Sequence, residues 1–473
     1  MVFSSNAFLF LFLPSFMALY YLTPKSLKNL LILIASYAFY AWWRIDFLAL
    51  FIAITLWNYG IAKMIHKKGI RSQAAYRWLT LGVIVDLSTL GYFKYANFGV
   101  ESFNAIISSL GIQPFETAPV LLPIGVSFYI FHAISYIVDV YRGDAEPTHN
   151  LIDFAAFVAL FPQQIAGPVL RYKDLAHQFV ERTHSLEMFY LGSIRFIQGF
   201  IKKVFIADSI APLVSSGFGM DTLSTGDAWV TALAYTAQLY FDFSGYSDMA
   251  IGLGMMMGFR FNKNFNQPYV SQSITEFWRR WHISLSNWLR DYLYIPLGGN
   301  RQGVFNTYRN LFLTMLLGGF WHGANWTFVL WGTWHGGWLV IEKYFGWGKT
   351  PYFQLHRLVL TFFLVVLGWV MFRAENVTSA MHMYEAMFLS FDFSLSALYA
   401  AQISLLQLST LVLAYGVLLW QGARYSGTVS SNKFASLPFL SQGWASLVLL
   451  TLFGLSLMKL SADSYSPFLY FQF

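Results

Sequence analysis

Long segments without a single charged side chain recur along the whole of this chain. A helix needs about 20 apolar residues to cross a bilayer. The charge-free runs are 1–24, 29–43, 47–62, 117–138, 154–170, 310–341, 393–423 and 434–458. Further candidates that hold a few charged or polar groups are 78–93, 190–210, 228–259 and 357–372. The pattern predicts an all-α, polytopic membrane protein with about ten to thirteen crossing segments, several of them too short or too glycine-rich to cross completely.

The composition excludes the main alternatives to a membrane protein. Only 11% of the 473 residues are charged, against about 25% in an ordinary soluble domain. A cytoplasmic enzyme, a disordered chain and a secreted disulfide protein are therefore excluded. The chain has no cysteine, so a Cys-based zinc site and a Cys thioester intermediate are excluded as well. Without a basic tail, the net charge of +7 predicts contact with anionic membrane lipid rather than nucleic acid.

The basic loops predict how the chain crosses the membrane. Lys25 and Lys28 follow the first apolar run, and the basic stretch 66–77 follows the third. The loop between them holds one basic and one acidic residue. Because cytoplasmic loops are enriched in Lys and Arg, we expect the N-terminus outside and 66–77 in the cytoplasm. No long polar linker divides the sequence, which predicts a single membrane domain over residues 1–473.

Segment 310–341 carries no formal charge and yet contains His322 and His335, each inside a Trp-His-Gly tripeptide. Ionisable groups at membrane depth are costly and indicate a functional site. Glycines around His322 permit a break in the helix and close approach of a ligand. An imidazole among apolar groups is expected to stay neutral, so His322 can act as a general base. The alternative is a histidine that only bonds a neighbouring helix. No acid lies in 310–341, and we expect no metal site.

Segment 273–293 combines an aromatic stripe with arginines. Ser273 followed by Glu276 predicts the start of a helix, and apolar residues at helical spacing predict that it continues through the segment. Such a helix is typical of the cytoplasmic membrane interface. Interfacial anchoring would explain the tryptophans and arginines but not His282, which lies at the border of the stripe. Three arginines could bind a phosphate-bearing acyl donor: Arg279, Arg280 and Arg290.

Segment 240–248 places Asp242 and Asp248 in an apolar region. Six positions apart, the two carboxylates do not share a helix face. We expect them to hold an irregular, buried backbone in place. Ser247 lacks the second glycine of a nucleophile elbow, so a serine hydrolase is not indicated.

Several motifs together resemble the membrane-bound O-acyltransferase family, in its bacterial branch that modifies extracytoplasmic polymers. Those that carry the resemblance are FWRRWHISLS at 277–286, RDY at 290–292 and GGFWHGA at 318–324. Segments 1–6, 93–98, 242–250 and 468–471 are most similar to members that acetylate alginate, and members that acetylate cellulose are the alternative. The resemblance implies a ring of transmembrane helices around a thin core, with re-entrant or interfacial helices and a central tunnel.

The resemblance also implies the chemistry. The invariant histidine of the family maps onto His322, and the second histidine of this branch onto His282. An acyl thioester, acetyl-CoA or an acyl-carrier thioester, would enter from the cytoplasm as substrate, with no permanently bound cofactor. Periplasmic esterase-like (SGNH) transferases would be partners, a polysaccharide the final acceptor, and the bacterial inner membrane the location. Because related systems use an aromatic C-terminal segment, Tyr470 is a candidate acyl carrier, and a simply membrane-buried tail is the alternative.

Two functions of other classes also suit a midplane histidine and broken helices. The first is a transporter that exports a polymer or a lipid-linked sugar, although the short Trp-His-Gly echo is too small to be an inverted repeat. The second is a scaffold for periplasmic transferases in which the histidines are only structural. The two histidine motifs favour the acyltransferase.

Overall fold

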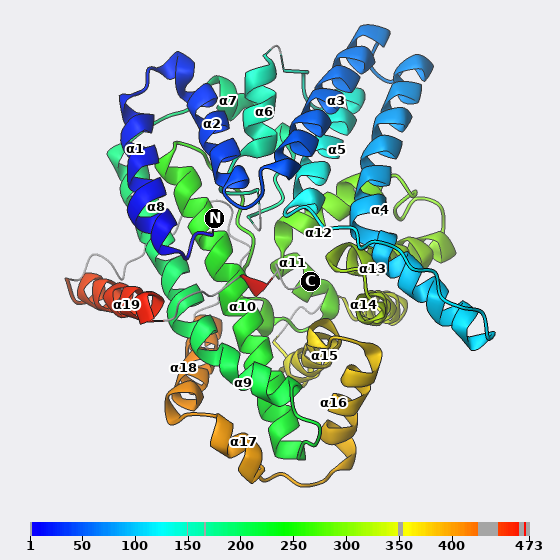
Figure 1. Cartoon of the computed structure of the whole chain (residues 1–473), viewed down its shortest axis with the longest axis vertical. Coiled ribbons are helices and arrows are strands. Elements are labelled where there is room, and N and C mark those ends of the chain that lie inside the picture. The colour runs from blue at the N-terminus through cyan, green and yellow to red at the C-terminus, as the bar shows by residue number, and fades with distance from the viewer. Residues whose placement is uncertain are drawn as a thin grey trace.

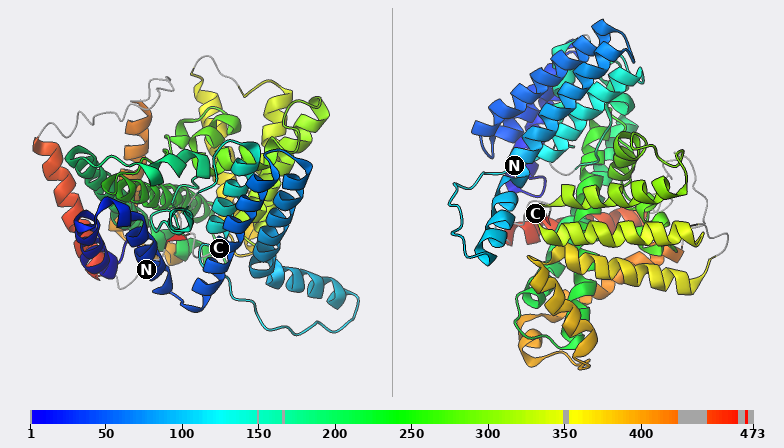
Figure 2. Two further views of the ribbon diagram at one scale, coloured as in Figure 1. Left: turned by 90° about the horizontal axis from the view of Figure 1, so that it is seen from above. Right: turned by 90° about the vertical axis from the view of Figure 1, so that its right-hand side faces the viewer.

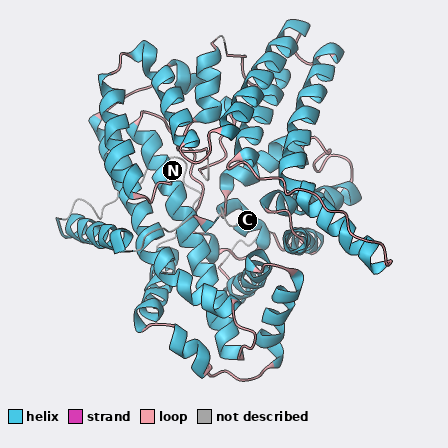
Figure 3. Cartoon of the chain, in the orientation of Figure 1, coloured by secondary structure: helices cyan, strands magenta, loops and turns pink. Residues whose placement is uncertain are grey.

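The computed structural model describes residues 2–148, 150–164, 167–348, 353–423, 443–462 and 468–469. Every regular element in these residues is helical, as the sequence predicts (Figure 3). The N-terminal elements are η1 (Ala7–Phe12), α1 (Leu13–Leu22), η2 (Lys25–Leu27), α2 (Lys28–Ala41), α3 (Asp46–Lys68), α4 (Gln73–Ser109) and α5 (Val126–Arg142). In this part α3 packs against α4 and α5 (Figure 1).

The middle of the chain is built around one long helix. Its elements are α6 (Leu151–Ala159), α7 (Tyr172–Val180), α8 (Leu186–Phe200), η3 (Ile201–Ala207), α9 (Asp208–Phe218) and α10 (Thr225–Met256). Helix α10 packs along α8, η3 and α9. The charge-free run 154–170 does not form one crossing helix, because α6 ends at Ala159 and Pro162 and Pro168 follow in a buried irregular segment.

The third part holds the candidate site and the C-terminal helices. Its elements are η4 (Pro268–Val270), α11 (Ile274–Arg280), α12 (Ile283–Leu289), η5 (Arg290–Tyr294), α13 (Val304–His322), α14 (Trp326–Tyr344), α15 (Leu355–Arg373), α16 (Val377–Leu389), α17 (Ala397–Gln402), α18 (Leu405–Ala423) and α19 (Gly443–Ala462). In Figure 1, α11 and α12 lie near the centre, with α10 on one side and α13 to α15 on the other. This arrangement places the short helices inside a surround of longer ones.

Four helices of the described residues are long and apolar enough to cross a membrane: α3, α15, most of α18, and α19. The segment Ala7–Leu22 is apolar but shorter. The sequence-based count of about ten to thirteen crossing segments rests on apolar runs, and most of these runs form helices that are shorter, or less apolar, than a simple span.

Helices α13 and α14 form a tight antiparallel pair, and α15 stacks beside α14 (Figure 2, right). Glycines permit the close approach. A Cβ atom added at Gly319 would lie 2.5 Å from the backbone oxygen of Phe328, and one added at Gly332 would lie 2.7 Å from that of Met315. Small residues at a helix interface let the two backbones touch, which is how helices associate without a hydrophobic driving force in lipid.

The expectation of an irregular backbone at 240–248 is wrong, because the segment is part of the regular helix α10. Its two acids instead join α10 to neighbouring segments. Asp242, almost fully buried, pairs with Lys203 of η3 at 2.7 Å and accepts the backbone N–H of Leu469 at 3.2 Å. Asp248 pairs with Arg195 and with a lysine, both near the α8–η3 junction. The helix itself satisfies the backbone, so the carboxylates are left for tertiary ion pairs.

Candidate active site

His322 is the last residue of α13. The predicted break by glycine is confirmed, since Gly323 is extended at φ −158° and ends the helix. A Cβ atom there would lie 2.1 Å from the ring of Phe328, so the turn has no room for a side chain. Asn325 then caps α14 by accepting the N–H of Thr327 at 3.0 Å. The helix therefore ends inside the protein and exposes its last carbonyl groups there.

Helix α4 supplies donors to those carbonyl groups. The Nζ atom of Lys94 donates to the backbone oxygen of His322 at 3.1 Å and also to that of Trp321. The hydroxyl of Tyr95 donates to the oxygen of Phe320 at 2.9 Å. A cation at a helix C-terminus is favourable because the carbonyl ends carry partial negative charge. These contacts fix the backbone of His322 and leave its ring to face the interior.

His282 lies at a break between two short helices. The N-cap Ser273 is confirmed, since its side chain accepts the N–H of Glu276 at 3.0 Å. The expectation of one continuous helix over 273–293 is wrong: α11 ends at Arg280, and His282 is in the left-handed region at φ 44°. A contact with a distant part of the chain breaks the helix at this point. The backbone N–H of Ile283 donates to the oxygen of Asn264 at 2.9 Å, so a neighbouring loop takes the place of the helical bond.

The two predicted histidines meet although 40 positions separate them in the sequence. The ring centres of His282 and His322 are 6.5 Å apart, and both side chains are buried. His322 lines a cavity of about 10 Å³, enough for about one water molecule. The other lining residues are apolar or aromatic: Leu239, Phe243, Trp281, Trp331, Trp369 and Phe372. We call His282 and His322 together the His282–His322 pair.

His335 is buried elsewhere, in the middle of α14. Its Nδ1 atom accepts the indole N–H of Trp278 at 3.4 Å. Trp331 separates it from His322, with ring centres 5.2 Å from His322 and 4.9 Å from His335. Within the described residues, no group of three or more His, Cys, Asp or Glu side chains could hold a metal ion. The expectation that no metal is used stays a prediction.

The three candidate arginines have different surroundings. Arg279 is exposed and lines a cavity of about 290 Å³ together with Lys343 and Glu342. Arg280 is buried and pairs with Glu276 at 2.6 Å. The three guanidinium groups therefore do not form one cluster on a single helix face, and only Arg279 faces this larger cavity.

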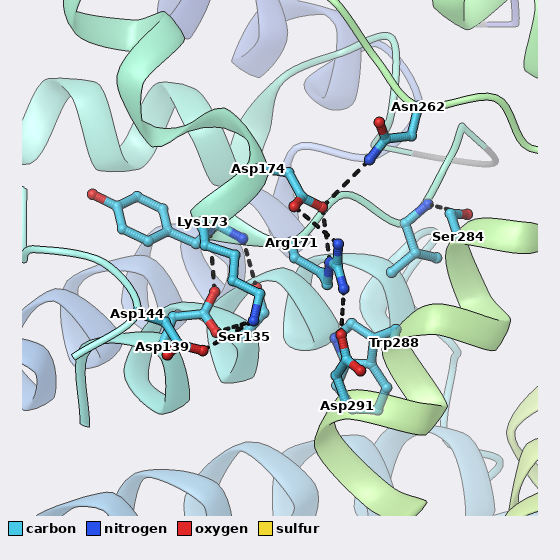
Figure 4. A network of polar contacts seen from close by, with 12 residues as sticks. Ser135, Asp139, Asp144, Arg171, Lys173, Asp174, Asn262, Ser284, Trp288 and Asp291 are labelled. Carbon is cyan, nitrogen blue, oxygen red and sulfur yellow. Dashed lines mark hydrogen bonds and ion pairs between the residues drawn. The ribbon is translucent and has the colours of Figure 1, made fainter. Parts of the chain in front are cut away.

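Arg290 bonds Asp291, which belongs with Arg171 and Asp174 to a polar network that anchors the segment before α7 (Figure 4). Its Nε atom bonds Asp291 at 2.7 Å, and Arg171 bonds both Asp291 and Asp174. Burial alone would raise the pKa of Asp291, but the hydrogen bond and charge of Arg290 and the charge of Arg171 hold that pKa below its usual value. Arg290 thus contributes to an ion-pair network between η5 and α7.

Tyr470 lies outside the described residues. The two residues before it that the structure describes are both buried in the core. The ring of Phe468 lies 5.8 Å from that of Phe243, which in turn lies 4.7 Å from the ring of His282. Phe468 therefore lies one aromatic ring away from His282.

Sequence reasoning missed Asn264 and Lys94 as members of the site. Asn264 is 1% exposed and bonds to the loop of His282. Both had at most a weak signal: Lys94 is a lone cation in an apolar stretch, and Asn264 is one of several polar residues in 262–267. Neither signal identifies the partner, which depends on packing between distant segments.

Comparison with known proteins gives consistent results. A sequence model of the membrane-bound O-acyltransferase family matches residues 142–384. The chain is 62% identical to the probable alginate O-acetylase AlgI of Pseudomonas putida and 60% identical to that of Azotobacter vinelandii, in both cases over 100% of each chain. It is 38% identical to a peptidoglycan O-acetyltransferase of Helicobacter pylori, over 82% of this chain and 80% of the relative. His282 and His322 both lie inside the matched region.

Proposed function

The chain belongs to the membrane-bound O-acyltransferase family, and from this we propose that it moves acetyl groups from a cytoplasmic thioester across the membrane for O-acetylation of an exported polysaccharide. It is an O-acyltransferase with helices apolar enough to span a membrane. We propose alginate as the polysaccharide, because the relatives that match over the full length are named alginate O-acetylases. Acetylation of cellulose is the alternative within the same class.

One observation carries the proposed chemistry. His322 is the last residue of α13, its ring lines a small cavity, and the centre of that ring lies 6.5 Å from the ring centre of His282. His322 takes the proton of an acceptor hydroxyl while the hydroxyl oxygen attacks the thioester carbonyl carbon. A C–O bond forms and the carbonyl electron pair moves onto oxygen. When the carbonyl re-forms, the C–S bond breaks and the thiolate takes the proton from His322. The apolar lining keeps the imidazole neutral before the reaction.

We assign the donor to the larger cavity. Arg279 and Lys343 give it two cationic side chains that suit the phosphates of acetyl-CoA or of an acyl-carrier thioester. The residue before Arg279 is Trp278, which bonds His335, and His335 touches Trp331 beside His322. This chain of contacts leads from the larger cavity toward the reacting centre. Donor binding by Arg280 and Arg290 stays a prediction, and each of them already bonds a carboxylate.

The acetyl group then needs a route to the polymer. We propose that Tyr470 receives it and passes it to periplasmic SGNH-type transferases. The burial of Phe468 beside Phe243 supports this, since Phe243 also touches His282. Intact-mass measurement after turnover should find an added acetyl group on the wild-type chain and none on Tyr470→Phe. A Tyr470→Phe variant with full activity would overturn this step.

We propose the bacterial inner membrane as the location, with the N-terminus in the periplasm. Lys25 lies between α1 and α2 and Lys28 begins α2, and the basic stretch 66–77 covers the end of α3, the connection after it and the start of α4. Both connections lie at the upper edge of Figure 1, which agrees with placing both on one side. Accessibility labelling of cysteines introduced singly into the cysteine-free chain tests the orientation.

A His322→Ala variant tests the function in cells. We expect polymer to be exported at the normal level without acetyl groups, because export does not need the base. The variant must be present in the membrane at the wild-type amount. If export stops, the protein is a transporter, and if acetylation continues, the histidine is structural and the protein is a scaffold.

A further inference from the structure

The side chain of Asn264 is bonded on every side to groups around His282. It lies in the loop between α10 and η4 and is 1% exposed. Its Oδ1 atom lies 2.8 Å from the hydroxyl of Ser284 and 3.3 Å from Nδ1 of His282. Its Nδ2 atom donates to the hydroxyl of Ser247 at 3.0 Å. One amide thus joins α10, the loop and the start of α12.

The backbone settles which end of this amide is oxygen. The N–H of Ser284 lies 3.2 Å from the Oδ1 atom, and a backbone N–H can only donate. The atom that faces Ser284 must therefore be the oxygen. The same oxygen faces Nδ1 of His282, and an amide oxygen can only accept. The hydroxyl of Ser284 also lies 3.5 Å from Nδ1, but its one hydrogen is donated to the Asn264 oxygen at 2.8 Å. It follows that Nδ1 of His282 carries a hydrogen.

This hydrogen decides what His282 can do. A neutral imidazole has one hydrogen, so the Nε2 atom of His282 presents a lone pair. That atom is buried and has no hydrogen-bond partner within the part of the chain that the structure describes. His335 has the opposite form: Trp278 donates to its Nδ1, so its hydrogen is on Nε2. The acceptor nitrogen of His335 is therefore already bonded to Trp278, whereas that of His282 has no partner among the described residues.

We propose that Asn264 is a positioning residue that holds His282 in the form with hydrogen on Nδ1, so that its Nε2 accepts a hydrogen bond from a donor group of the substrates bound beside His322, other than the hydroxyl hydrogen that His322 takes. This rests on the proposed acyl transfer. His282 then cannot donate a hydrogen bond to the thioester oxygen. Its part in the His282–His322 pair is that of an acceptor.

Neighbouring hydrogen bonds and ion pairs fix the positions of the segments that carry Asn264 and His282. The hydroxyl of Ser284 accepts the backbone N–H of Val169 at 2.9 Å. The residues just after Val169 are held by the ion pairs of Arg171 with Asp174 and Asp291 (Figure 4). The left-handed backbone of His282 adds strain that only such contacts maintain. A fixed ring orientation is what a positioned acceptor requires.

The test is ¹⁵N magnetic resonance of the histidine-labelled full chain in lipid, with a His282→Gln spectrum to assign the signal. We expect hydrogen on Nδ1 in the wild type and in Asn264→Asp, which keeps an oxygen in place. In Asn264→Leu we expect loss of that form and a fall in kcat of about 100-fold, within the range that misplaced acid–base groups cause. If Leu does not fold, Asn264→Ser withdraws the oxygen with a smaller change in shape.

Asn262→Ala is the matched control, because Asn262 is exposed and only reaches Asp174 at 3.5 Å. It should keep both the spectrum and the activity. A wild-type spectrum with hydrogen on Nε2 of His282, or an unchanged hydrogen position in both Leu and Ser variants, overturns the inference. Loss of activity without change in the hydrogen position also overturns it, since that is a merely structural role. If the wild type transfers no acetyl group at all, the proposed function fails instead.

Discussion

The same tripeptide, Trp-His-Gly, occurs twice in the helical pair α13–α14, with different surroundings. His322 is the last residue of α13, and its ring lines a cavity beside His282. His335 lies in the middle of α14, fully buried, and accepts a hydrogen bond from Trp278. Gly323 ends a helix, whereas Gly336 allows close packing of α14 on α13, its built Cβ atom lying 3.1 Å from the oxygen of Phe312.

The difference teaches that the position of a histidine relative to a helix end decides whether its ring lines a cavity. At a helix end the chain turns away and leaves space beside the ring. In the middle of a packed helix, neighbouring turns and helices fill that space. Under the proposed function the first histidine meets the substrate, whereas the ring of the second packs against aromatic side chains.

The largest expected effect comes from the matched variants His322→Gln and His335→Gln. We expect acetyl transfer to fall about 100-fold or more in the first, because the base is lost. The second should stay within about tenfold, since a glutamine oxygen can still accept from Trp278. Transfer from labelled acetyl-CoA in membrane vesicles measures both. A larger loss in His335→Gln would reverse the comparison.

The second prediction concerns the glycines that bring the two tripeptides together. Gly319→Val places side-chain atoms against the backbone oxygen of Phe328, which cannot move aside. We expect a loss of stability of several kcal/mol, about that of an overpacked core or more. Thermal unfolding in detergent measures it. Gly337→Ala is the control, since nothing lies within 4 Å of a Cβ atom there, and it should change stability by less than about 1 kcal/mol.

The third prediction tests the structural role of His335. In His335→Leu the indole N–H of Trp278 loses its acceptor inside the protein. An unsatisfied buried donor costs about 1–3 kcal/mol, so the unfolding temperature should fall. The activity of the folded fraction should change little. If stability is unchanged while activity is lost, His335 belongs to the reacting site.

The smallest expected effect distinguishes Arg279 from Arg290. Arg279→Ala should raise the KM for acetyl-CoA about five- to tenfold with little change in kcat, as for the loss of an exposed phosphate contact. Arg290→Ala should leave the KM nearly unchanged, because its partner is Asp291. Steady-state kinetics in vesicles distinguish them. If both variants raise the KM for acetyl-CoA equally, the donor contacts both arginines and the assignment to Arg279 alone is wrong.

Several features follow from local sequence alone. The absence of charge predicts membrane helices, and the described part of the chain has four that are long and apolar enough to cross. The glycines around His322 predict the helix break that Gly323 provides. Ser273 predicts the start of α11 correctly, but the continuous helix after it fails because Asn264 bonds the backbone of Ile283. Helical spacing continues through that break, so periodicity could not reveal it.

The sequence by itself determined the membrane class, the helical character and the two histidine motifs, because each depends on residues that are near neighbours in the chain. Only the tertiary structure decided that His282 and His322 meet, that Arg279 rather than Arg290 lines the larger cavity, and that Asn264 bonds His282. These contacts join segments that are distant in the sequence. Their formation depends on how whole helices pack, which no local pattern encodes.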